Sequence, residues 1–285
     1  MGKSIREQFI PKKKLDFLQI DGTFEEAKQN LKTPRCIDAG VMRMGMADID
    51  FGFDDNEAPA MFERIAAQVE HAMPSFAEWG GEVDHDLGTG VQLLFMENKT
   101  GALGAAIQAR ERLLKRAEMI RDMTFGLSYG KVVLGVLGGA ESYSVMSFSQ
   151  VSFISAFLQQ VTGKYSASIL VSEELIRQDP SLTSKYSCRL LGKFYFGKIK
   201  KTLKVYDFYD GDEIAVRTAK RKTDLLFDKG VSLFLAEDFA RARSYFIEVI
   251  KANRGDKAAR IYLSLCDTFR ENPPESPEEL CIERV

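Results

Sequence analysis

Apolar residues recur along this chain with two different spacings, one helical and one of period two. Apolar side chains at positions 62, 65, 69, 73 and 76 have helical spacing and predict an amphipathic helix over residues 57–79, which Pro74 is expected to kink or divide. Similar spacing predicts helices over residues 21–31, 100–118, 149–162 and 173–178. Alternation of period two predicts strands over residues 41–50, 123–129, 131–137, 166–171, 188–196 and 203–209.

Turn signals connect several of these strands. Residues 81–95 are predicted to form a hairpin around the tripeptide Gly88, Thr89 and Gly90, because alternating residues precede the glycines and an apolar run follows them. A second hairpin is expected to turn at Gly130. Strands and helices alternate, so the fold class is α/β, an α+β sandwich with a mixed sheet and helices on one face.

After residue 212 the pattern predicts helices alone, over residues 223–236, 239–253 and 256–270. Gly230, Ala242 and Phe246 have the small, small, aromatic spacing of a tetratricopeptide helix pair, although Val249 and Arg254 depart from the usual alanine and proline. One such pair cannot bury its own apolar face. It is therefore expected to dock on the preceding domain or on a partner protein.

These patterns divide the chain into five parts. They are an arm with a short helix (residues 1–35), the α/β domain (36–210), a linker (211–222), a tetratricopeptide-like helical hairpin with one further helix (223–272) and an acidic tail (273–285). The basic residues of the linker are expected to be solvated.

Composition narrows the class of protein. The chain has 285 residues and a net charge of -2, which argues against general nucleic-acid binding. Its four cysteines are scattered without zinc-ligand spacing and indicate free thiols in a reducing compartment. The first 14 residues are polar and basic, and no apolar run reaches the length of about 20 residues that spans a bilayer. We therefore expect a cytoplasmic protein without membrane insertion.

Several motifs together carry a family resemblance. Three features of the sequence follow one another in the order found in class III adenylate and guanylate cyclase domains. They are the segment Met46-Ala47-Asp48-Ile49, the hairpin over residues 80–95, and the glycines at positions 126, 130, 135 and 138. The chain resembles that family over about residues 41–208. The resemblance implies a ferredoxin-like nucleotide cyclase fold, and the helices after it resemble the all-helical appendage of many bacterial members.

The resemblance also implies a chemistry. In this family the ribose 3'-hydroxyl attacks the α-phosphate of a nucleoside triphosphate and expels pyrophosphate, in sites that lie between two subunits. Two aspartates on one subunit hold two divalent cations, Mg or Mn, which activate the hydroxyl and neutralise phosphate charge. The opposing face supplies purine-reading residues, an asparagine and an arginine, and the arginine stabilises the transferring phosphate.

Carried over to this chain, the resemblance places altered residues at most of these positions. Asp48 falls at the first metal position, with Asp50 as a competitor, and Thr89 falls at the second, where a neutral hydroxyl is a poor ligand for a hard cation. The purine-reading positions fall at His85 and at Ser144 or Met146. The asparagine position becomes Phe153 and the arginine position becomes Phe157.

These replacements favour a catalytically silent cyclase domain, a pseudoenzyme of cyclic-nucleotide signal transduction without a cofactor. It would act as a homodimer or as a heterodimer with another cyclase-type domain. Two alternatives stay open. One is a divergent adenylate cyclase in which Asp50, Asp54 or Asp55 replaces the missing carboxylate, and the other is a module that binds a nucleoside triphosphate without turnover. The rings of Phe153 and Phe157 could serve core packing or a dry dimer contact.

Overall fold

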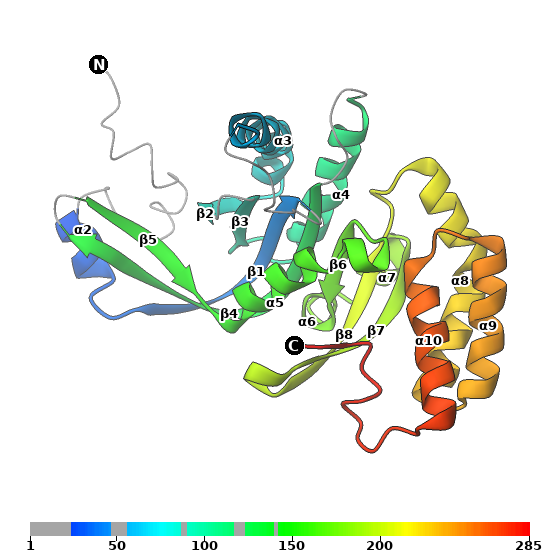
Figure 1. Ribbon diagram of the computed structural model, residues 1–285. Coiled ribbons are helices and arrows are strands. Elements are labelled where there is room, and N and C mark those ends of the chain that lie inside the picture. Colours follow the sequence, from blue (N-terminus) through cyan, green and yellow to red (C-terminus); the bar gives the residue numbers. More distant parts are fainter. Residues whose placement is uncertain (1–23, 47–55, 87–89, 117–122, 140–141) are drawn as a thin grey trace.

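The fold is built on one mixed β-sheet (Figure 1). The computed structural model describes residues 24–46, 56–86, 90–116, 123–139 and 142–285. Along the sheet the strand order is β2 (Glu82–Asp86), β3 (Gly90–Phe95), β1 (Arg35–Met46), β4 (Met123–Gly139), β6 (Ile169–Ser172), β8 (Lys201–Phe208), β7 (Cys188–Phe196) and β9 (Glu283–Arg284). Strand β5 (Ser142–Phe148) pairs with the far part of β4 as a hairpin arm. The β4–β6 and β7–β9 pairs are parallel, and the other pairs are antiparallel.

Helices cover both faces of the sheet, whereas the sequence predicted helices on one face. Helices α3 (Ala58–Glu78) and α4 (Gly101–Leu114) share a core with Phe125 and Leu127 of β4. Helix α5 (Gln150–Gln160) lies over the other side of β4, where Gly126 is located. Successive side chains of a strand point to opposite faces, so β4 serves two helical layers at once.

Strand β4 runs straight through the expected turn at Gly130. It pairs with β1 from Met123 to Leu134, and Gly130 lies opposite Ala39 within this ladder. The prediction of a hairpin at Gly130 was therefore wrong, and β4 instead forms its hairpin with β5. Long-range pairing with β1 satisfies the backbone here, which a local turn signal cannot reveal.

Helix α3 also continues through its predicted breaking point. Pro74 lies inside the single helix, which begins after Glu57. Proline in a helix interior costs about 3 kcal/mol. Ala72 and Phe76 are fully buried in the core on either side of it, and this packing offsets the loss of one backbone hydrogen bond.

The expected appendage consists of helices α8 (Ile214–Leu235), α9 (Phe239–Ala252) and α10 (Lys257–Glu271). Asp238 and Asp256 cap the last two through their carboxylates. Phe246 of α9 packs over Gly230 of α8 and stacks on Tyr262 of α10, with ring centroids 4.6 Å apart. The helices share one core with β7 and β8, so they dock on the preceding domain. The remaining short helices are α2 (Phe24–Asn30), α6 (Glu173–Ile176), α7 (Leu182–Lys185), η2 (Gly163–Tyr165) and η3 (Gly197–Ile199).

Buried charges join this helical unit to the sheet, where the sequence predicted a solvated linker. Helix α8 already begins at Ile214, and the Nζ atom of Lys220 lies 2.9 Å from Asp207 and 2.8 Å from Asp212. Arg189 of β7 bridges Asp207 at 3.1 Å and Asp256 at 2.5 Å. Burial raises the pKa of Asp207, against the attraction of Lys220 and Arg189. The linker prediction therefore differs from the structure.

Among the described residues, no helix combines the length and the apolar character that crossing a membrane requires.

Candidate functional site

Helix α5 carries Phe153 and Phe157, the two residues that the resemblance is expected to align with an asparagine and an arginine. Its first turn is fixed by Ser149, whose hydroxyl accepts a hydrogen bond from the backbone amide of Ser152 at 3.0 Å. The helix lies against β4 so closely that a Cβ atom at position 126 would overlap the backbone of Ser155 and Gln159. Glycine at position 126 therefore sets the distance between α5 and the sheet.

Phe153 and Phe157 meet other aromatic rings of the same chain. The Phe157 ring lies 5.7 Å from Phe196 and 6.5 Å from Phe194 of β7, and the Phe153 ring lies 6.2 Å from Phe196, each in an edge-to-face arrangement. Such geometry is favourable for aromatic pairs. Both rings are half-buried and pack against the core that holds β7 and the C-terminal helices. We call these four residues the aromatic cluster.

The aromatic cluster has no group that could neutralise a phosphate. Phenylalanine neither donates a hydrogen bond nor carries charge. The nearest cation among the ring contacts is Lys198, whose Nζ atom lies 5.8 Å from the centre of the Phe153 ring. This arrangement stabilises apolar contact between α5 and β7.

A second group of side chains connects the β2–β3 hairpin to β5 and α5. The carboxylate of Asp84 accepts hydrogen bonds from Gln92 at 3.0 Å and from the hydroxyl of Ser147. The Gln92 amide also lies 3.1 Å from the Ser152 hydroxyl. Asp84 is buried and occupies a β-bulge, because the pairing shifts between Val83 and His85. A bulge redirects a side chain, and here it turns a carboxylate toward neighbouring strands.

A third polar group holds the end of β1 to the end of α5. The Gln159 amide donates to the backbone oxygen of Met46 at 3.0 Å and to the Thr124 hydroxyl at 3.1 Å, and Thr162 donates to Thr124 at 2.9 Å. These side chains are buried. The position of the last β1 residue, which precedes the predicted metal strand residues, is thus fixed by α5.

The structure places the predicted site residues in different parts of the fold. Phe153 and Phe157 come together on α5. Ser144 is exposed on β5 opposite Leu137, and it is Ser147 that reaches β2. The backbone of His85 pairs with Gln92, and Met146 lies opposite Gly135. The predicted metal positions Asp48, Asp50 and Thr89 lie outside the described residues.

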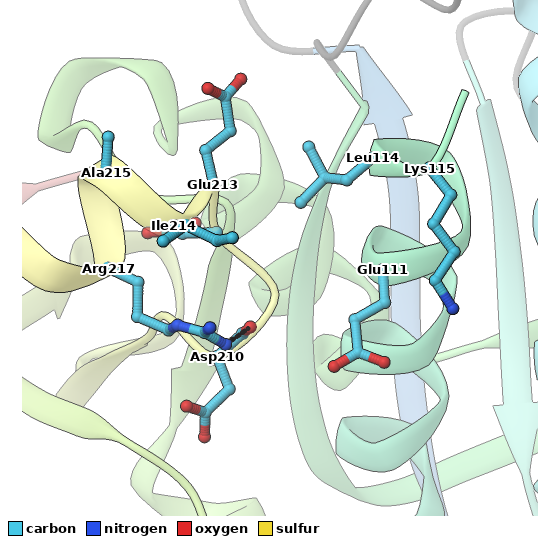
Figure 2. Close-up of a pocket in the computed structure, with 9 residues that line it drawn as sticks. Glu111, Leu114, Lys115, Asp210, Glu213, Ile214, Ala215 and Arg217 are labelled. Carbon is cyan, nitrogen blue, oxygen red and sulfur yellow. Dashed lines mark hydrogen bonds between the residues drawn. The ribbon is translucent and has the colours of Figure 1, made fainter. Parts of the chain in front are cut away.

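Within the described ranges, no group of three or more His, Cys, Asp or Glu side chains is arranged to hold a metal ion. A cleft of about 620 Å³ lies elsewhere, between the end of α4 and the start of α8 (Figure 2). Glu111, Lys115, Asp210 and Arg217 contribute charges of both signs to its wall. Of the predicted site residues that the structure describes, none lines this cleft.

Sequence reasoning missed the cluster of Asp84, Gln92 and Ser147. These residues come from three strands, and they meet through a bulge that has no sequence signature. The resemblance pointed to the neighbouring positions His85 and Ser144, one and three residues away. The aromatic partners Phe194 and Phe196 were also missed, because their alternation predicts only a strand with one apolar face.

Comparison with known proteins supports the fold. No protein-family model matches the chain. It is 20% identical over 206 residues, 68% of this chain, to the terminal-differentiation specific adenylate cyclase of Dictyostelium discoideum, of which it spans 10%. It superposes on the structure of a bacterial light-regulated adenylyl cyclase with a TM-score of 0.52 and 15% identity, covering 64% of this chain and 55% of that one. The α/β part of this chain therefore has an adenylate/guanylate cyclase-like fold.

Proposed function

We propose that this chain is a catalytically silent cyclase-like module of intracellular cyclic-nucleotide signalling, which acts through dimerisation or regulated contact with another cyclase-type domain. The observation that carries the proposal is the aromatic cluster. Side chains at positions 153 and 157 pack against Phe194 and Phe196. Removal of one preorganised donor costs about 2.7 to 4 kcal/mol of transition-state stabilisation, so loss of both donors leaves negligible turnover.

The first test is cyclic AMP and cyclic GMP production by the purified chain. ATP or GTP is supplied with excess manganese, which gives a weakened two-metal site its best opportunity, and the Asp48→Ala variant is the matched control. We expect no product above that of the control, because neither Phe153 nor Phe157 can stabilise charge on the transferring phosphate. Product formation that disappears in the Asp48→Ala variant would refute the silent module.

The second candidate is a divergent adenylate cyclase. It is favoured by the match to the Dictyostelium enzyme over most of this chain. Asp48 and Asp50 would then hold Mg or Mn, and a residue outside the family pattern would replace Thr89. A nucleotide sensor is distinguished by a thermal denaturation measurement beside this assay. A nucleotide that raises the melting temperature of the chain without forming product binds without turnover.

The hairpin arm of β4 and β5 supports dimerisation. Val133 of β4 lies opposite Phe148 of β5. Leu137, four residues further along β4, lies on the same face of the arm. These side chains are 36%, 84% and 66% exposed. Large exposed apolar residues grouped on one face mark an interaction surface. The opposite face of the arm packs Val132, Leu134 and Val145 into a core that it shares with α2, β1 and β3.

A charge on this arm is expected to weaken the dimer. We predict that Phe148→Glu shifts the chain toward monomer at micromolar concentration in sedimentation velocity, because a carboxylate in a dry contact is costly to desolvate. Thr183→Glu on α7 is the matched control, since Thr183 is exposed and belongs to a helix outside the β4–β5 arm. An unchanged monomer–dimer equilibrium in Phe148→Glu would show that this face is not the contact.

A further inference from the structure

The segment over residues 280–285 adds a strand to the outer edge of β7. The sequence predicted an acidic tail here. In the structure the Ile282 amide donates to Lys193 O at 2.9 Å, the Val285 amide donates to Tyr195 O at 2.9 Å, and Gly197 donates to Val285 O at 2.6 Å. The resulting pair of β9 with β7 is parallel. An edge strand offers unpaired backbone groups, and this segment satisfies them.

Side chains of the segment are recognised individually. Leu280 and Ile282 are buried in the core of the C-terminal helices. A Cβ atom at position 192 would lie 2.9 Å from the Cδ1 atom of Ile282, so glycine makes room for this side chain. The carboxylate of Glu283 accepts hydrogen bonds from Lys164 at 2.7 Å and from the Tyr165 hydroxyl at 2.6 Å. Cys281 is buried as well, so the edge selects three consecutive apolar residues and then an acidic one.

The connection to α10 is loose. Residues 272–279 contain three prolines and are exposed or half-exposed, and the described hydrogen bonds of this stretch stay within it or reach the adjoining ends. Residues 280–285 are thus joined to α10 through an exposed polar tether. A tether of this length keeps the local concentration of the peptide in the millimolar range.

We propose that the outer edge of β7 is a peptide-binding site, which the chain fills with its own segment 280–285 and which also takes an extended segment of a partner protein with the same pattern. The partner strand would add in parallel to β7, in the manner of β-strand addition. Its acidic residue would contact Lys164 and Tyr165, and its apolar residue would occupy the space over Gly192. This site does not depend on the proposed silent-module function.

The edge of β7 that this segment occupies lies beside the aromatic cluster, because Phe194 and Phe196 belong to β7. Phe194 pairs with Glu283 across the β7–β9 register, and its ring faces Phe157 of α5. A partner segment of different length, or with side chains of different size, would therefore alter the packing of β7 directly beside α5.

A cleavable chain tests the proposal. A protease recognition sequence is inserted between Pro274 and Glu275, the full chain is folded, and the tether is then cut. We expect the severed segment to dissociate on dilution, and a labelled peptide of residues 278–285 to bind the cut chain with micromolar Kd and the uncut chain at least tenfold more weakly. Equal binding to both forms, or no binding to the cut chain once its segment has left, would overturn the proposal.

A charge exchange tests the recognition itself. The peptide with Glu283→Lys should bind the cut chain at least tenfold more weakly, and Lys164→Glu in the cut chain should restore part of that loss. In the unmodified chain, the amides of Ile282 and Val285 should exchange hydrogen at least tenfold faster than those of β4, because the segment opens locally. Exchange as slow as in β4, or equal binding of the two peptides, would contradict a replaceable segment.

Discussion

Replacing Arg189 with methionine is expected to lower the free energy of unfolding by about 3 to 5 kcal/mol, because it leaves buried carboxylates without their partner. Arg189 is fully buried, bridges Asp207 and Asp256, and lies 4.1 Å from the centre of the Phe227 ring. Lys220 continues to pair with Asp207 in this variant, so the uncompensated charge falls on Asp256, at the start of α10. Urea denaturation followed by circular dichroism measures the change.

The matched control is Arg243→Met. Arg243 also contacts an aspartate, with Nε 2.6 Å from Asp267, but this pair lies on the surface. Exposed pairs contribute little to stability because solvent screens them, so the control should change the free energy of unfolding far less than Arg189→Met does. If Arg189→Met destabilised the chain no more than Arg243→Met, the buried charges would not be what joins the helical unit to the sheet.

Gly126→Ala is expected to destabilise the chain by about 3 kcal/mol, at the upper end of the cost of overpacking. The added methyl group would overlap backbone atoms of Ser155 and Gln159, and a helix backbone cannot move aside as a flexible side chain can. Helix α5 would have to lift away from β4, which separates Phe157 from its partners on β7. Thermal and urea denaturation report the loss of stability.

Gly135→Ala on the same strand is its control. No atom lies within 4 Å of the position that a Cβ at residue 135 would take, so alanine should change the free energy of unfolding by no more than about 1 kcal/mol. Similar destabilisation by both substitutions would show that the close approach of α5 to residue 126 does not determine the cost.

The aromatic cluster shows which features of the candidate site could be predicted from the sequence and which could not. The resemblance predicts Phe153 and Phe157 at the positions of an asparagine and an arginine, and residue identity alone shows that neither side chain is a hydrogen-bond donor. Helical spacing likewise predicted α5, α9 and α10 close to their observed bounds. These features are local, because a helix is specified by residues three and four positions apart.

Contacts between residues that are distant along the chain could not be predicted from the sequence. Lys220 belongs to a basic stretch that reads as solvated, since lysine is seldom buried, but Asp207 and Asp212 lie within 3 Å of it in the fold. The turn predicted at Gly130 gave way to pairing with β1, and residues 283 and 284 became a strand because β7 offered an unpaired edge.

The sequence by itself determined the period of each long element and the chemical character of Phe153 and Phe157, since both are properties of neighbouring residues or of single side chains. Only the tertiary structure decided which rings meet Phe153 and Phe157, which charges are buried together, and that Asp84 turns toward Ser147. Those outcomes depend on contacts between different strands and helices, and the free energy of such contacts is not encoded in any short stretch of the chain.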